Sequence, residues 1–133
     1  MVGTEQPVEV VLKSARSLRA EGRIDEAERA YFEAAKLARS GKDRRVLAHA
    51  LRHLSDLARS RGASPEAWKC ASEAALIYRG SDDRLGLANS IRLQALSAAT
   101  PETSEACWRE ALEIYSSLGV IAGVAECESH LGC

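Results

Sequence analysis

The feature that most constrains the fold of this chain is an internal repeat. Segments 33–38 (EAAKLA), 73–78 (EAALIY) and 110–115 (EALEIY) align with spacings of 40 and 37 residues. A second landmark keeps the same two spacings in its alanines, which are Ala48, Ala88 and Ala125. Two independent landmarks with one period are hard to produce by chance, so the sequence predicts a repeat architecture.

Each period contains two stretches with helical apolar periodicity, separated by polar breaks. The abundant Ala, Leu, Glu and Arg side chains lose little rotamer freedom in a helix, which supports this interpretation. The predicted repeats span about 7–40, 43–80 and 83–118, and a last helix spans about 120–131. Their helices are expected at 7–20 and 24–39, 43–61 and 64–79, and 83–99 and 100–118.

Local signals mark the helix ends. Gly22 and Gly62 are suited to the turns inside the first two repeats. Ser64 and Thr100 each precede a Pro and a Glu, an order that predicts an N-cap, a proline in the first turn and an acidic side chain at the positive end of the helix dipole. Paired helices of this length cannot bury their apolar faces singly, so they are expected to stack. The predicted fold is an all-α solenoid, with three antiparallel helix pairs and a C-terminal helix in a single domain, 1–133.

Composition excludes several classes of protein. With 46% hydrophobic and 28% charged residues, the chain is not typical of a disordered segment. It has no run of 18 apolar residues and no signal-peptide pattern at its N-terminus, so a cytoplasmic protein with no membrane contact is expected. The four cysteines form no CxxC pair and are interpreted as reduced, small apolar side chains: Cys70, Cys107, Cys127 and Cys133.

The repeats resemble those of the tetratricopeptide family. One copy has the small, large, glycine, apolar, alanine, aromatic, alanine order in Ala15, Leu18, Gly22, Ile24, Ala27, Tyr31 and Ala34. A second copy is carried by Leu54, Ser55, Gly62, Ala67, Ala71 and Ala74, and a third by Ala95, Trp108 and Ala111. The period near 40 is similar to that of the long repeats of kinesin light chains and bacterial signalling proteins. This resemblance implies a right-handed superhelix whose first helices line a concave surface that binds a protein or peptide without catalysis.

On that resemblance, the candidate binding residues are the first-helix polar residues that packing does not need. They are Arg16, Arg19, His49, Arg52, His53, Asp56, Arg59, Asn89 and Arg92. A groove lined in this way would be basic, and the planar donor fork of arginine suits an acidic or C-terminal carboxylate peptide. The alternative is that these charges simply face water. The carboxylate clamp of chaperone-binding members is not matched, because Leu12 stands where its first Lys would lie.

Other chemistry has weaker support in the sequence. His49, His53 and Asp56 share one helix face, but no Glu follows the first His and no fourth ligand is evident, so no metal or cofactor is predicted. The two histidines are expected to change charge near neutral pH, and a metal- or ligand-responsive regulator is the third hypothesis. No nucleophile motif or phosphate-binding glycine loop is present, so the chain is not expected to be an enzyme.

Charge is distributed unevenly along the chain. Residues 1–61 contain 13 Lys and Arg against 9 Asp and Glu, and residues 62–133 contain 5 against 10. No aromatic residues alternate with the basic ones to stack bases, so nucleic acid is an unlikely partner. The last helix has an apolar face made of Val120, Ile121, Val124 and Leu131. A structural unit that forms a homo-oligomer through this C-terminal helix is therefore the alternative function.

Overall fold

The computed structural model describes residues 7–132 of the chain. Within this part the chain forms seven α-helices and no strand: α1 (Val8–Ala20), α2 (Ile24–Ser40), α3 (Arg44–Ser60), α4 (Ser64–Arg79), α5 (Arg84–Ser97), α6 (Pro101–Leu118) and α7 (Ile121–Leu131). None of the helices in this part is long and apolar enough to cross a membrane. The predicted all-α, solenoid-like fold is confirmed, and the helix bounds lie within about two residues of the expected ones.

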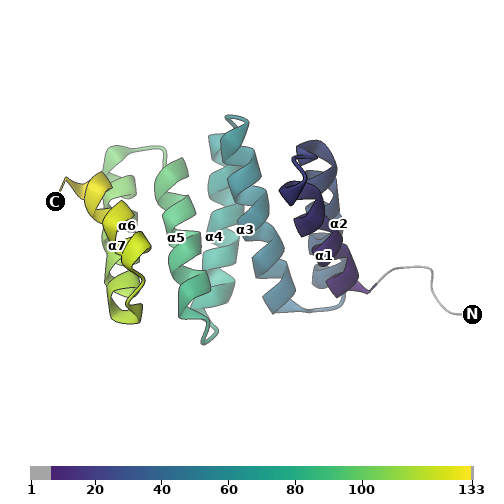
Figure 1. Ribbon diagram of the computed structural model, residues 1–133. Coiled ribbons are helices and arrows are strands. Elements are labelled where there is room, and N and C mark those ends of the chain that lie inside the picture. The colour runs from purple at the N-terminus through teal and green to yellow at the C-terminus, as the bar shows by residue number, and fades with distance from the viewer. Residues whose placement is uncertain (1–6, 133) are drawn as a thin grey trace, which may run out of the picture.

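Consecutive helices pack against one another in alternating directions, and the helix pairs follow one another along a line (Figure 1). The row runs from α1 at one end to α7 at the other, with α2, α4 and α6 behind the remaining helices in this view. The buried core is continuous and rich in alanine, including Ala15, Ala27, Ala34, Ala74 and Ala111, each fully buried. Such small side chains let neighbouring helices approach closely.

The helix starts follow local side-chain chemistry in three places. The side chains of Asp43, Asp83 and Thr100 accept hydrogen bonds from the backbone N–H groups of Val46, Gly86 and Thr103, at 3.2, 2.8 and 3.2 Å. Each bond satisfies one of the unpaired donors at a helix N-terminus.

The expectation that Ser64 is an N-cap was wrong. In the structure α4 starts at Ser64 itself, the cap position belongs to Ala63, and no side chain caps the helix. Gly62, in the turn between α3 and α4, has a φ of +84°, and α4 begins two residues after it. The cap is therefore one residue earlier than the Ser-Pro-Glu pattern indicates.

Two glycines are required by packing between repeats. A Cβ atom on Gly86 would lie 2.4 Å from Cε1 of Tyr78, and one on Gly123 would lie 2.5 Å from Cδ1 of Tyr115. A tyrosine ring of one second helix therefore occupies the space that a side chain on the following first helix would need. The equivalent positions 40 residues before Tyr78 and Gly86 are Ala38 and Val46, and both are buried. At this first junction the small residue is on the second helix and the larger one is on the following first helix.

The first helices of successive repeats are not equally close. The backbone of α3 approaches both α1 and α5, whereas α7 packs on α6 and its backbone does not approach that of α5. The row of first helices is therefore closed along α1, α3 and α5 and open between α5 and α7. This opening positions the candidate site.

The described cysteines fit the apolar interpretation in part. Cys127 is fully buried, Cys70 and Cys107 are half-buried, and all three are free thiols. Burial raises the pKa of each of these thiols, which keeps them protonated. Cys133 lies outside the described residues.

Candidate functional site

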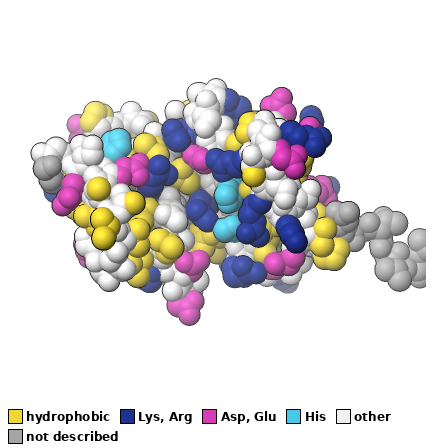
Figure 2. Space-filling view, viewed as in Figure 1, with side chains coloured by type: hydrophobic (Ala, Val, Ile, Leu, Met, Phe, Trp, Pro, Cys, Tyr) yellow, Lys and Arg dark blue, Asp and Glu magenta, His cyan; other side chains and the backbone are white. Residues whose placement is uncertain are grey.

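A hollow of about 350 Å³ lies on the face formed by the first helices. We call it the α5–α7 groove, and its lining is Arg19, Arg52, His53, Asp56, Asn89, Arg92, Leu93, Tyr115, Val120, Ala122, Gly123 and Glu126. Figure 2 shows this face, on which basic side chains gather with histidine over α1 and α3, while apolar side chains are more prominent toward α7. The groove therefore has a polar side and an apolar side.

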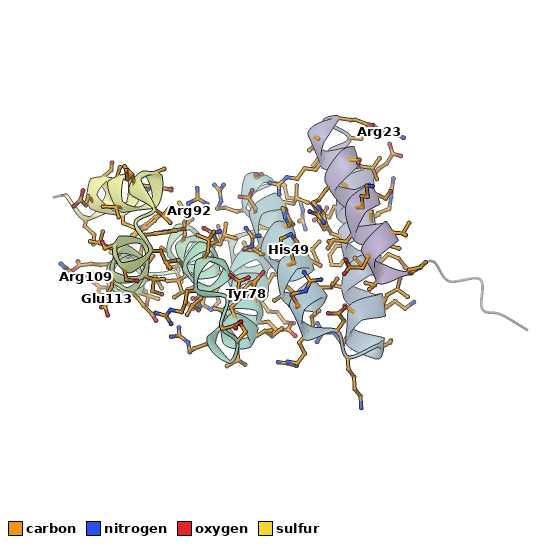
Figure 3. The ribbon with its side chains drawn as sticks, turned by 60° about the horizontal axis from the view of Figure 1, so that its bottom comes forward. Arg23, His49, Tyr78, Arg92, Arg109 and Glu113 are labelled. Atoms are coloured by element: carbon orange, nitrogen blue, oxygen red, sulfur yellow. The ribbon has the colours of Figure 1, made fainter. Side chains whose placement is uncertain are left out.

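The groove gathers six of the nine residues predicted from the sequence, and these are Arg19, Arg52, His53, Asp56, Asn89 and Arg92. Arg16 is exposed on α1, and His49 and Arg59 are partly buried on α3; none of these three lines the groove. Figure 3 shows His49 on α3 and Arg92 on α5, well away from Arg109 and Glu113 on α6.

Sequence reasoning missed six of the lining residues, which are Leu93 on α5 and five residues outside α1, α3 and α5. Tyr115 belongs to a second helix, and Val120, Ala122, Gly123 and Glu126 belong to α7 or to the residue before it. The resemblance directs attention to polar residues on the first helices, so it contains no signal for a buried tyrosine from behind. The 37-residue spacing from Gly86 to Gly123 is a sequence signal that could have indicated this junction.

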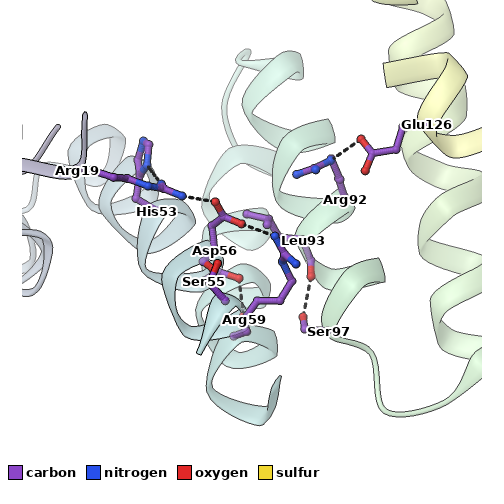
Figure 4. A network of polar contacts seen from close by, with 11 residues as sticks. Arg19, His53, Ser55, Asp56, Arg59, Arg92, Leu93, Ser97 and Glu126 are labelled. Atoms are coloured by element: carbon purple, nitrogen blue, oxygen red, sulfur yellow. Dashed lines mark hydrogen bonds and ion pairs between the residues drawn. The ribbon is translucent and has the colours of Figure 1, made fainter. Parts of the chain in front are cut away.

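Asp56 pairs with two arginines on the polar side of the groove (Figure 4). It forms an ion pair with Arg19 of α1, and its Oδ1 accepts a hydrogen bond from Nη2 of Arg59 at 2.9 Å. Burial by itself raises the pKa of Asp56, but the hydrogen bonds from Arg59 and Arg19 outweigh it and hold that pKa below its usual value. Asp56 is therefore ionised, and its single negative charge is shared between Arg19 and Arg59, so one positive charge of this cluster remains.

The two histidines of α3, His49 and His53, are neutral, contrary to the expectation that their charge changes near pH 7. Nδ1 of His53 lies 2.7 Å from Nη1 of Arg19, and the His53 ring stacks on Tyr31 with centroids 4.7 Å apart. Nδ1 of His49 lies 3.2 Å from Nη2 of Arg52. Because a guanidinium can only donate, each Nδ1 must be an acceptor. Burial, followed by the charge of Arg52, lowers the pKa of His49 to about 4 and that of His53 to about 3.

These contacts also disfavour a metal site. The Nδ1 atoms of His49 and His53 already accept from arginines, and Asp56 is held by two guanidinium groups. Among residues 7–132 no group of three or more His, Cys, Asp or Glu side chains is placed to hold a metal ion.

The apolar side of the groove is crossed by one polar bridge. Nε of Arg92 on α5 donates to Oε1 of Glu126 on α7 at 2.7 Å (Figure 4). Next to it, the hydroxyl of Tyr115 donates to Oδ1 of Asn89 at 2.6 Å. Burial raises the pKa of Tyr115 to about 12, so this hydroxyl stays protonated. The groove is therefore less basic than the sequence suggests, because Arg19 and Arg92 both have acidic partners.

In comparisons with known proteins, no family model and no curated protein sequence matches the chain. The repeat and the groove are therefore interpreted from the residues of this chain and their geometry.

Proposed function

We propose that this chain is a tetratricopeptide-like repeat module that binds an extended segment of a partner protein in the α5–α7 groove. The observation that carries the proposal is the separation of α7 from α5, which leaves a hollow of about 350 Å³ between apolar and polar walls. Pockets of this size with a few placed polar groups are typical of binding sites. The role is non-catalytic, and a cytoplasmic location is part of the same proposal.

The arrangement of the groove supports a protein segment as its ligand. The polar wall comes from α1, α3 and α5, and the apolar wall includes Leu93, Val120 and Ala122. An extended peptide presents successive side chains to opposite sides, so it could place a polar side chain on one wall and an apolar one on the other.

The test is a selection of random displayed peptides on the full chain, followed by affinity measurements on two matched variants. Ala122→Trp fills the groove, because Ala122 is exposed and lines it. Ala125→Trp places the same ring on the exposed part of the same helix outside the groove. We expect Ala122→Trp to weaken the selected peptides about tenfold or more while Ala125→Trp leaves them unchanged. Equal effects of the two substitutions would contradict the proposal.

A second candidate function is self-association through the outer face of α7. It is favoured by the side chain of Ile121, which is 83% exposed, beside the exposed Ala125. The other members of the apolar face predicted from the sequence, Val120, Val124 and Leu131, are partly buried against the core. One residue works against it, because Glu128 stands where the fully buried Ile91 stands 37 residues earlier. Sedimentation velocity over a wide concentration range tests this candidate, and a mass that stays monomeric would exclude it.

A further inference from the structure

The repeat register places two arginines in equivalent surroundings with different neighbours. Arg52 on α3 and Arg92 on α5 are 40 residues apart, and two further groove residues on the next first helix, Asn89 and Glu126, are 37 residues apart. These are the spacings of the repeat itself. At the later position the pair is complete, since Nε of Arg92 donates to Glu126 at 2.7 Å. At the earlier position an amide stands in place of the carboxylate.

Asn89 does not replace the missing acid. It has no charge, and its Oδ1 already accepts the 2.6 Å hydrogen bond from Tyr115. Arg52 donates from Nη2 to the neutral ring of His49 and lies beside the hydroxyl of Tyr78, neither of which carries a negative charge, and its Nε is buried with no acceptor among residues 7–132. An incompletely paired donor of this kind has lost hydration without regaining an equivalent partner.

The other arginines that line the groove have their carboxylates. Arg19 pairs with Asp56 and Arg92 pairs with Glu126, whereas no ion pair to Arg52 is found in the described part of the chain. Arg52 is therefore the groove cation whose anion must come from outside. The walls next to it constrain that anion, because Asp56 and Glu126 would repel a second carboxylate and Leu93, Val120 and Ala122 offer apolar contact.

We propose that Arg52 binds a single carboxylate of the partner segment, while the wall of Leu93, Val120 and Ala122 takes an apolar side chain next to it. The inference rests on the proposed function and deepens it. The segment recognised is an acidic residue adjacent to an apolar one, and not a run of acidic residues. Arg52 supplies two or more donors in a planar fork, which is the geometry that a carboxylate accepts best.

The test uses three capped peptides that differ in the central pair: acetyl-Gly-Glu-Leu-Gly-amide, its Gln-Leu analogue and its Glu-Glu analogue. Binding is followed by NMR, including the Nε–Hε signals of the arginine side chains. We expect the Glu-Leu peptide to bind about tenfold more tightly than the Gln-Leu peptide and to shift the Arg52 signal. The Glu-Glu peptide should bind more weakly than Glu-Leu.

Two substitutions address the same site from opposite directions. Arg52→Gln removes the cation and should abolish the preference for Glu over Gln. Asn89→Glu supplies the missing acid from within the chain, as Glu126 does for Arg92, and should abolish the preference while leaving the thermal midpoint unchanged or higher. Because Asn89→Glu retains Arg52, it keeps the test decisive if Arg52→Gln fails to fold.

The outcomes separate this inference from the proposed function. The role of Arg52 is overturned by any of three results. These are equal affinities for the Glu-Leu and Gln-Leu peptides, a preference for the Glu-Glu peptide, or no binding of the Glu-Leu peptide. If displayed peptides still compete for the groove and lose affinity with Ala122→Trp, the proposed function stands without it. If neither the capped nor the displayed peptides bind in the groove, both proposals are wrong.

Discussion

Along the face that contains the groove, α1 and α3 pack together, whereas α5 and α7 stand apart with a hollow between them. On the α1–α3 side, Asp56 holds Arg19 and Arg59, and His53 stacks on Tyr31. On the α5–α7 side, the ion pair of Arg92 and Glu126 spans the gap. Both ends of this face are therefore cross-linked by an ion pair, but the helices are in contact at the α1–α3 end, the closed region, and stand apart at the α5–α7 end, the open region.

The junctions between repeats differ in a related way. Ala38 and Val46 occupy the first junction, whereas a tyrosine and a glycine occupy the equivalent positions in the next two, as Tyr78 with Gly86 and Tyr115 with Gly123. The ring of Tyr115, which reaches onto the backbone of α7, also lines the groove, whereas the ring of Tyr78 does not. A junction can therefore place its large residue on either the second helix or the following first helix. Where the large residue is on the second helix, its ring lies behind the concave face.

The largest expected effect comes from exchanging these partners. Gly86→Val should lower the free energy of unfolding by about 3 kcal/mol, because its side chain would overlap the ring of Tyr78. Urea denaturation measures the loss. Gly80→Ala is the matched control and should be nearly neutral, since a Cβ there meets nothing closer than 3.6 Å.

The same exchange can be made complete. The double substitution Tyr78→Ala and Gly86→Val recreates the Ala38 and Val46 pair of the first junction. It should be more stable than the two single losses predict, by about 1–3 kcal/mol. Strictly additive losses would show that the two positions are not coupled.

Removing the carboxylate of the closed region should have the next largest effect. Asp56→Asn leaves the partly buried Arg19 and Arg59 without their shared anion, so the free energy of unfolding should fall by about 2 kcal/mol. Chemical denaturation at neutral pH measures it. Asp82→Asn, in the exposed turn before α5, serves as the control and should change stability little.

Acid should weaken the closed region selectively. Because the folded-state pKa values of His49 and His53 are lowered to about 4 and about 3, the unfolded chain binds more protons between those values and pH 6.5. Stability is therefore full above pH 6.5 and falls as the pH decreases, by about 1 kcal/mol per histidine between pH 6.5 and 5 after allowance for solvent screening. The lowered pKa of Asp56 adds a further loss only below about pH 4.

The pH prediction is checked by urea denaturation at pH 7.5, 6 and 5. In the double variant His49→Gln and His53→Gln, the stability should be lower at pH 7.5 but nearly independent of pH in this range. A variant that keeps the slope of the original chain would show that other groups are responsible.

The smallest effect is expected in the open region. Glu126→Gln removes a single, partly exposed ion pair, so the free energy of unfolding should fall by only about 0.5 kcal/mol. Glu128→Gln, exposed on the same helix, is the matched control. If Glu126→Gln costs as much as Asp56→Asn, the contrast between the two regions is wrong and α7 is held mainly by its ion pair.

The sequence by itself determined the helices and their order. The glycines at 22 and 62 and the cap at Thr100 act over a few residues, so local physics is sufficient to place them. The repeat register also placed the nine candidate side chains on the first helices. It could not tell which of them share a pocket, because that depends on how far apart the helices stand.

The tertiary structure alone decided the charge and shape of the groove. Arg19 meets Asp56 across 37 residues of sequence, and Arg92 meets Glu126 across 34, so the neutralised arginines can be recognised only when the helices are packed. Burial then fixed the histidines in their neutral form, and Tyr115 entered the groove from the layer behind. Electrostatic and packing energies depend on distance in space, and this dependence leaves Arg52 as the groove cation without an anion of its own.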